Sequence, residues 1–187
     1  MTEGGRGGEV LRNLCRRQFS NTLTPVQVYL EGVNRMFQQQ RRERRPKPPS
    51  ASQLRAMERR THDLINEQRK RAKLAPLAWD DRVAQVARAH SQRMADANFF
   101  DHTDPRFGDV DKRLDRFGVQ WQMCGENIFT CNGFRNPEQL AVREWMNSPR
   151  HRQNILTAEF THAGIGIVYR SDGSYYFTQV FIRPLKR

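Results

Sequence analysis

The stretch Gly125-Glu126-Asn127-Ile128, followed further along by Trp145-Met146-Asn147-Ser148-Pro149-Arg150-His151, decides how we interpret this chain. A glutamate beside a glycine, and a histidine just past a Ser-Pro helix stop, are residue types that metal-assisted or acid-base sites use. Upstream, Phe99-Phe100-Asp101-His102 supplies a second imidazole. If the fold brings His102, Glu126 and His151 into one cleft, two imidazoles and one carboxylate would form a metal site with an open position.

Helices and strands are expected on both sides of this stretch. The expected helices are 53–75, 81–97, 110–117 and 136–148, and the expected strands are 120–130, 163–170 and 175–182, with a short turn at 150–155. The last two strands should pair as a hairpin, because their link contains Asp172-Gly173. Helices on both sides of a small antiparallel sheet predict an α+β fold, a three-layer α-β-α sandwich.

Hydrophobic spacing predicts which faces of two helices are buried. Ser52 is expected to cap the first helix, whose buried side consists of Leu54, Met57, Thr61, Leu64, Ile65 and Gln68. Its solvent side is expected to hold Arg55, Arg59, Arg69 and Lys70. Asp80 is expected to cap the next helix, in which we interpret His90 as a hydrogen-bonded core histidine rather than a ligand.

Length and charge predict one domain with a basic extension. A chain of 187 residues has room for one ordinary domain plus an appendage. The net charge is +12: residues 1–52 carry ten Lys or Arg against four Asp or Glu, residues 53–75 seven against three, and the rest fifteen against thirteen. Because 46–50 is rich in proline, we predict a basic extension over 1–50 and a domain over 51–187.

The extension is predicted to be partly disordered, with one helix near 25–42. Thr24-Pro25-Val26-Gln27 has the arrangement of a capping box and precedes an apolar stripe. Three interpretations stay open: a helix that packs on the domain, a helix that docks to a partner or contacts an anionic membrane or another polyanion, and an arm that contacts nucleic acid phosphates. Nucleic acid is disfavoured, because no interleaved aromatic residues or reading motif accompany the arginines.

The three cysteines are predicted to be free thiols. Cys124 and Cys131 bracket residues 126–130, which are expected to be extended and would hold their Cα atoms roughly 23 Å apart, whereas a disulfide needs less than about 7 Å. Cys15 lies in the basic extension. No apolar run reaches the length of about eighteen residues that a spanning helix needs, and the first residues lack the apolar stretch of a signal peptide.

The motifs occur in an order that resembles the CAP superfamily, which comprises cysteine-rich secretory proteins, antigen 5 and pathogenesis-related proteins. Besides those quoted above, they are His151-Arg152-Gln153-Asn154-Ile155-Leu156, Phe160-Thr161, Gly164-Ile165-Gly166 and Tyr176-Phe177-Thr178-Gln179. The resemblance covers about Gln53 to Pro184 and is closest to the shorter, prokaryotic-type branch. It implies an α-β-α sandwich with a cleft lined by two histidines and two acids, where some members bind zinc or another divalent ion.

Carried over by position, the resemblance implies particular site residues. The histidines are His102 and His151, the candidate metal ligands, and the first acid is Glu126, a candidate catalytic residue. In the longer members the second acid lies where this chain has Ser148. Glu144, one helical turn earlier on the same face, is a further candidate for its role.

Two classes of function stay open. We favour a binding module for a lipid, sterol, peptide or glycan, with zinc or another divalent cation as cofactor, by analogy with the family. The alternative is a zinc-dependent, peptidase-like hydrolase in which His102 and His151 hold the ion and Glu126 is the general base. A structural hydrogen-bond network of Glu126, Asn127 and His151 would also explain these residues. The resemblance implies a secreted protein, whereas no signal peptide is visible, so the compartment is left open.

Overall fold

The structure is a computed structural model that describes residues 47–185. All of these residues except Lys47 belong to the second of the two units into which the chain divides, Pro48–Arg187. The elements are α2 (Ala51–Arg71), β1 (Ala78–Trp79), α3 (Asp81–Ala97), α4 (Val110–Arg116), β2 (Trp121–Asn132), α5 (Pro137–Asn147), α6 (Pro149–Leu156), β3 (His162–Tyr169) and β4 (Ser174–Pro184). The predicted extension over 1–50, its helix near 25–42 and its polyanion contacts lie outside the described residues, except at its end.

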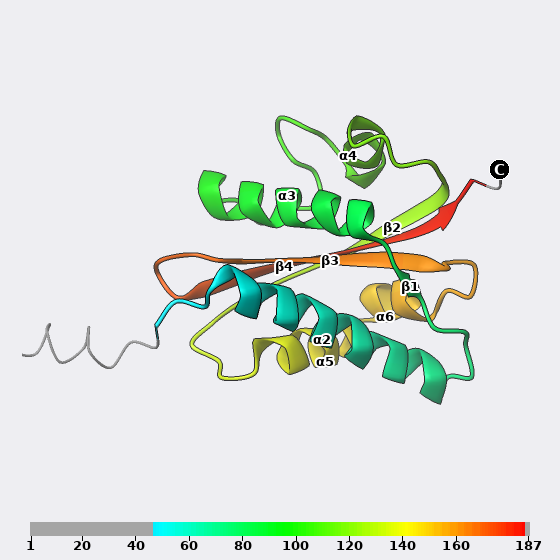
Figure 1. Cartoon of the computed structure of the whole chain (residues 1–187), viewed down its shortest axis with the longest axis horizontal. Helices are drawn as coiled ribbons and strands as arrows, with labels where there is room; N and C mark the ends of the chain where they lie inside the picture. Colours follow the sequence, from blue (N-terminus) through cyan, green and yellow to red (C-terminus); the bar gives the residue numbers. More distant parts are fainter. Residues whose placement is uncertain (1–46, 186–187) are drawn as a thin grey trace, which may run out of the picture. The chain divides into compact units, whose positions relative to one another are not determined.

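Four strands form one sheet between two layers of helices. The strand order is β1-β3-β4-β2, with β1 parallel to β3 and the other neighbours antiparallel. Helices α3 and α4 cover one face of the sheet, and α2, α5 and α6 cover the other (Figure 1). The predicted three-layer sandwich is therefore confirmed. The sequence does not predict β1, because two residues are too few to show alternating hydrophobicity.

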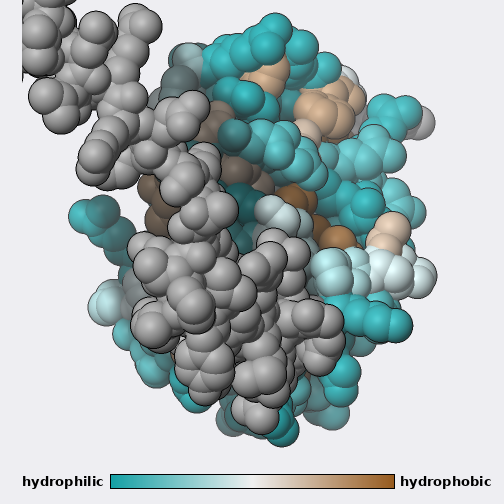
Figure 2. Space-filling view, turned by 90° about the vertical axis from the view of Figure 1, so that its left-hand side faces the viewer, coloured by the Kyte–Doolittle hydropathy of each residue, from teal (hydrophilic) through white to brown (hydrophobic). Residues whose placement is uncertain are grey.

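The core occupies both faces of the sheet. Trp145, Phe177 and Phe181 belong to the cluster on the side of α2, α5 and α6, while Val180 and Leu114 belong to the cluster under α3 and α4. Figure 2 shows hydrophobic residues at mid-height of the face it draws, with mostly hydrophilic residues above them. Burial of alternate β4 side chains on opposite faces follows from the period of two in a strand.

Two glycines of β3 allow α3 to lie directly on the sheet. A Cβ atom at Gly164 would lie 2.1 Å from the backbone nitrogen of Ala84, and one at Gly166 would lie 2.1 Å from the backbone nitrogen of Arg88. No side chain can be accommodated at these distances. The close approach fixes the height of α3 above the sheet, and α3 leads into the loop that carries His102.

Helix α2 differs from the prediction at two points. Its N-cap is Ser50 rather than Ser52, because Ser50 accepts the backbone N–H of Gln53 while the Gln53 side chain accepts the N–H of Ser50. Arg69 is 1% exposed, so its predicted exposure is wrong. Its guanidinium donates to four backbone carbonyls, those of Ala75, Ile155, Thr157 and Phe160. Since these carbonyls lie after α2, at the end of α6 and in the segment that follows α6, the spacing along α2 alone cannot reveal them.

The predicted turn at 150–155 is wrong, because Pro149–Leu156 form helix α6. Ser148 is at once the C-cap of α5 and the N-cap of α6. Pro149 occupies the first helical position, where a missing N–H leaves no helical hydrogen bond unmade. The Ser-Pro pair therefore ends one helix and begins the next, and it places His151 in the first turn of α6.

Cys124 and Cys131 are free thiols, as predicted, and Cys15 lies outside the described residues. Burial, together with nearby carboxylates, raises the pKa of Cys124 to about 11, and burial alone raises that of Cys131 to about 11. Such thiols are weak nucleophiles near neutral pH. Within residues 47–185, none of the helices combines the length and the apolar character that crossing a bilayer requires.

Candidate functional site

The candidate site surrounds the middle of β2, an edge strand of the sheet. Glu126 pairs with Val180, whose side chain belongs to the cluster under α3 and α4, so Glu126 faces those helices. Asn127 pairs with Gln179 and points to the opposite face, where α6 lies. Because β2 has a neighbouring strand on one side only, side chains from both helical layers can meet around its free edge.

Glu126 is a buried carboxylate with both oxygens occupied. The residue is 7% exposed. Its Oε1 lies 2.9 Å from Nδ1 of His102, and its Oε2 accepts a hydrogen bond of 2.8 Å from Nη2 of Arg113. The same Nη2 donates to the carbonyl oxygen of His102 at 3.1 Å. A buried carboxylate needs such partners, and here they tie the α3–α4 loop, α4 and β2 together.

His102 is the exposed member of this group. It lies in the loop between α3 and α4, and its side chain is 52% exposed. The hydrogen bond to Glu126 raises the pKa of His102 above its ordinary value, although partial burial opposes the shift. Because a carboxylate accepts at Nδ1, that nitrogen carries the proton and Nε2 is left to meet a ligand.

His151 approaches His102 from α6. The two ring centres are 6.4 Å apart, and the rings are tilted by 43°. Burial, and secondarily the charge of His102, lower the pKa of His151 below its ordinary value. The side-chain amide of Asn127 donates to the His151 carbonyl at 3.1 Å, and that of Asn154 donates to Asn127 Oδ1 at 2.9 Å. These amides fix α6 on β2.

The structure thus places His102, Glu126 and His151 around one point of the edge strand. Glu126 contacts the His102 ring directly, whereas His151 is held through its backbone by Asn127. The hydrogen bonds of Asn127 therefore have a structural role, which agrees with the interpretation of Glu126, Asn127 and His151 as a structural hydrogen-bond network. The imidazole ring of His102 is exposed, and that of His151 is half-buried.

Arg113 is not apparent from the sequence as a residue of the network. Arg113, the ionic partner of Glu126, lies on α4 and is buried. A buried glutamate implies a nearby cation, but the sequence offers many arginines and does not say which one is turned inward. His90 is also buried, and its Nε2 lies 3.0 Å from the Asp101 carbonyl and 3.9 Å from Glu126 Oε1. The interpretation of His90 as a hydrogen-bonded core histidine agrees with this position.

Glu144, the further candidate for the second acid, pairs with Arg143 rather than with the other site residues. Its Oε1 accepts a hydrogen bond from Nε of Arg143 at 3.1 Å, and its side chain is 44% exposed. None of the hydrogen bonds or ion pairs within residues 47–185 joins it to His102, Glu126 or His151. In that part of the chain, no three His, Cys, Asp or Glu side chains are grouped closely enough to hold a metal ion by themselves.

Comparison with known proteins assigns the family. The model of the cysteine-rich secretory protein family, CAP, matches residues 62–181. The chain belongs to the CAP family. The match includes every residue of the candidate site. Because α2 begins before it and β4 ends after it, the CAP domain of this chain extends slightly beyond the matched residues.

Relatives of this CAP domain occur in Bacillus. The protein YkwD of Bacillus subtilis (strain 168) is 41% identical over 131 residues, which are 70% of this chain and 49% of YkwD. The membrane protein YlbC of the same strain is 39% identical over 126 residues, 67% of this chain and 34% of YlbC. The chain therefore spans half or less of these curated relatives, and their remaining parts have no counterpart in the match.

Solved structures share the fold of this CAP domain. An extracellular protein containing an SCP domain from Bacillus anthracis str. Ames is 35% identical, with a TM-score of 0.62, and the match covers 74% of this chain and 45% of that chain. An outer surface protein from Borrelia burgdorferi has a TM-score of 0.61 at 21% identity, covering 70% of this chain and 94% of that chain. The second likeness supports the fold alone.

Proposed function

We propose that this CAP domain is a binding module whose contact surface is the pair of imidazoles of His102 and His151, with a divalent cation such as Zn²⁺ as the first ligand. The observation that carries the proposal is the double engagement of Glu126. Since its two oxygens bind His102 and Arg113, the buried carboxylate serves to orient other groups. A general base must instead reach a substrate or water with a free oxygen.

The donor atoms fit a cation of borderline softness. Zinc-binding histidines usually donate their second N–H to a carboxylate, and Glu126 is placed to accept it from His102. The lowered pKa of His151 favours its neutral form, which is the form that binds metals. Two imidazoles that share one zinc ion have ring centres roughly 5–6 Å apart, from a Zn–N bond of about 2.0–2.1 Å. The observed 6.4 Å is close to this range.

The same geometry implies modest affinity. Structural zinc sites have four protein ligands, whereas His102 and His151 supply two. Arg150, next to His151, adds a positive charge that opposes a cation. Water and a bound molecule would complete the coordination, and the exposed ring of His102 leaves room for them. A peptide or glycan, which offers carbonyl, carboxylate or hydroxyl oxygens, suits such positions better than a sterol or a lipid chain.

Calorimetric titration of the full chain with ZnCl₂ tests the proposal, in a Cys15→Ser background that removes the thiol of the extension. We expect one Zn²⁺ per chain, and we expect His102→Ala and His151→Ala each to weaken binding by at least about tenfold. His162→Ala is the matched control and should bind like the parent. Equal affinity of the parent, His102→Ala and His151→Ala would contradict the proposal.

Incubation of the zinc-loaded chain with a peptide library separates binding from hydrolysis. We expect retention of peptides without cleavage, because Glu126 is engaged and Glu144 pairs with Arg143. Cleavage that is lost on adding a chelator, and lost again in Glu126→Gln, would instead establish the hydrolase.

A further inference from the structure

A cavity lies between α3, α4 and the loop that joins them, beside the Glu126 network. Its volume is about 320 Å³, which is at the small end of the range of ligand sites. The residues that line it include Val86 and Ala89 of α3, Phe107 of the loop, and Phe117 at the C-cap of α4. The accessible surface of the cavity is almost entirely apolar. It therefore suits a hydrophobic body, and its two phenylalanines favour an aromatic one.

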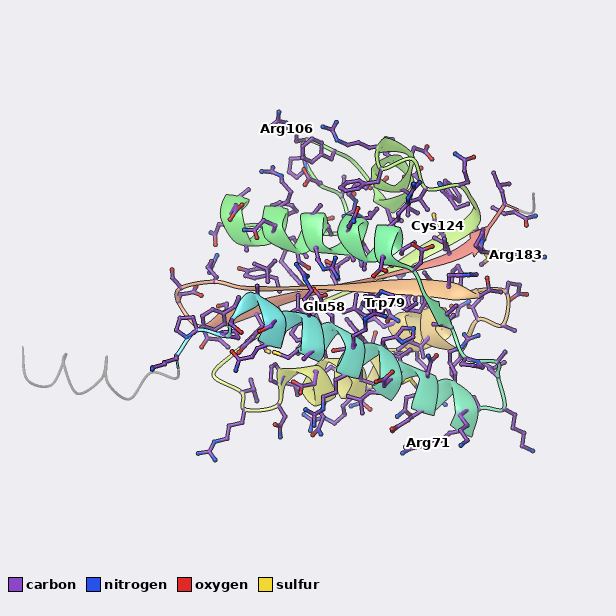
Figure 3. The ribbon with its side chains drawn as sticks, in the orientation of Figure 1. Glu58, Arg71, Trp79, Arg106, Cys124 and Arg183 are labelled. Atoms are coloured by element: carbon purple, nitrogen blue, oxygen red, sulfur yellow. The ribbon has the colours of Figure 1, made fainter. Side chains whose placement is uncertain are left out.

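Three arginines surround the Phe107 ring, and two of them, Arg93 and Arg116, also line the cavity. The guanidinium carbons of Arg116, Arg106 and Arg93 lie 4.5, 5.1 and 5.6 Å from the centre of the Phe107 ring. Arg106 projects from the outer end of the loop, away from the sheet (Figure 3). Arg93 is paired with Asp104 at 3.2 Å, whereas no ion pair within residues 47–185 includes Arg106 or Arg116. Two uncompensated positive charges therefore lie at an aromatic wall.

Arg113 adds hydrogen-bond donors from inside. It lines the cavity and is buried, and its Nη2 is used by Glu126 and the His102 carbonyl. Its Nε and Nη1 have no hydrogen-bond partner within the described part of the chain. Glu126 offsets the charge of Arg113, so Arg113 offers the cavity its two unused N–H donors rather than a net charge. Together with the unpaired guanidinium groups around Phe107, these donors favour a ligand that carries an anionic hydrogen-bond acceptor.

We propose that this cavity binds a small planar aromatic carboxylate, with its ring system against Phe107 and Phe117 and its carboxylate at the guanidinium group of Arg116, while Arg106 adds positive charge from the other side of the Phe107 ring. Arginine side chains bind carboxylates through paired N–H groups and also stack on aromatic faces, so both parts of the ligand are matched. The proposal is separate from the function proposed for His102 and His151, and it requires no metal ion.

Binding of 2-naphthoate to the full chain, measured by calorimetry in the presence of a chelator, tests this site. Ala89→Phe fills the cavity and should weaken binding by at least about tenfold, a loss of about 1.4 kcal/mol. Ala56→Phe places the same side chain on the exposed face of α2 and should leave the affinity unchanged. Circular dichroism of each variant shows whether it folds.

A second pair of measurements tests the charge and does not depend on the folding of Ala89→Phe. The double variant Arg106→Gln, Arg116→Gln changes two exposed positions and should bind 2-naphthoate about tenfold more weakly than the parent does. The neutral analogue 2-naphthalenemethanol should bind the parent about tenfold more weakly than the acid does, and it should not distinguish parent from double variant.

Three results that do not involve His102 would overturn the proposal. They are absence of 2-naphthoate binding to the parent, equal binding by Ala89→Phe and Ala56→Phe, and equal affinity for the acid and the alcohol. His102→Ala should bind 2-naphthoate like the parent. Loss of binding in that variant would place the probe at the histidine pair and would also refute the separate cavity site, whereas zinc binding is tested independently of either outcome.

Discussion

Glu126 Oε1 lies 2.9 Å from His102 Nδ1, and this contact joins the edge strand to the loop between α3 and α4. It raises the pKa of His102, because a buried carboxylate favours the protonated ring. In chelator-treated protein, we expect the NMR titration midpoint of His102 to exceed about 6.5, its unperturbed value. Glu126→Gln, which keeps the shape and removes the charge, should lower this midpoint. The signal of His62 is the internal control, and an unchanged His102 midpoint would contradict the assignment.

The same contact makes folding stability depend on pH. Since the folded-state pKa of His102 is raised, its contribution is complete below the unfolded value of about 6.5 and is lost as the pH rises through the folded-state pKa. The stability advantage of the parent over Glu126→Gln should therefore shrink over that interval. Urea unfolding at several pH values measures it. An advantage that grows across the same interval would show that His102 is not the responsible group.

Replacing Arg69, which lies outside the candidate site, should lower the stability of the fold strongly. Arg69→Met keeps most of the apolar stem but leaves four carbonyls without their donor, so the free energy of unfolding should fall by about 3 kcal/mol. Arg71→Met, on the exposed end of the same helix, should change it by less than about 0.5 kcal/mol. Chemical denaturation compares the two. Similar losses in both variants would show that the buried hydrogen bonds contribute little.

A helix, strand or turn could be predicted from the sequence where neighbouring residues alone cause it. Asp80 caps α3, and Asp172-Gly173 closes the hairpin, so both elements are foreseen from neighbouring residues. Ser148-Pro149 is ambiguous, because the same pair can end a helix or begin one, and here it does both. Local patterns give no reason to expect the short strand β1, which exists only because β3 lies beside it.

At the candidate site, the sequence likewise does not predict which arginine is buried beside Glu126. His102, Glu126 and His151 could be named from their motifs, and the structure places them together. Arg113 could not be named, because its inward orientation results from the position of Glu126 on another element. Arg69 is a second example, with acceptors contributed mainly by the end of α6 and the segment after it. Such partners are set by tertiary packing rather than by spacing along one helix.

The close approach of α3 to β3 predicts a steric effect at Gly166. Gly166→Ala would place a Cβ 2.1 Å from the backbone of Arg88, so α3 must shift, and the free energy of unfolding should fall by about 3 kcal/mol. Gly118→Ala is the control for backbone strain alone: its φ is 66°, but no atom lies within 4 Å of the added Cβ. It should lose about 1 kcal/mol. Thermal unfolding of both variants distinguishes the causes, and an equal loss would argue against direct packing.

The thiols of Cys124 and Cys131 should be alkylated slowly in the folded protein. Because the pKa values of Cys124 and Cys131 are raised to about 11, few of these groups are thiolates at pH 8. In a Cys15→Ser background, folded protein should react with iodoacetamide at least about 100-fold more slowly than the same protein in urea, where the thiol pKa returns to about 8.5. Mass spectrometry follows each site. Fast labelling of Cys124 in folded protein would mean that its sulfur is less buried than the structure places it.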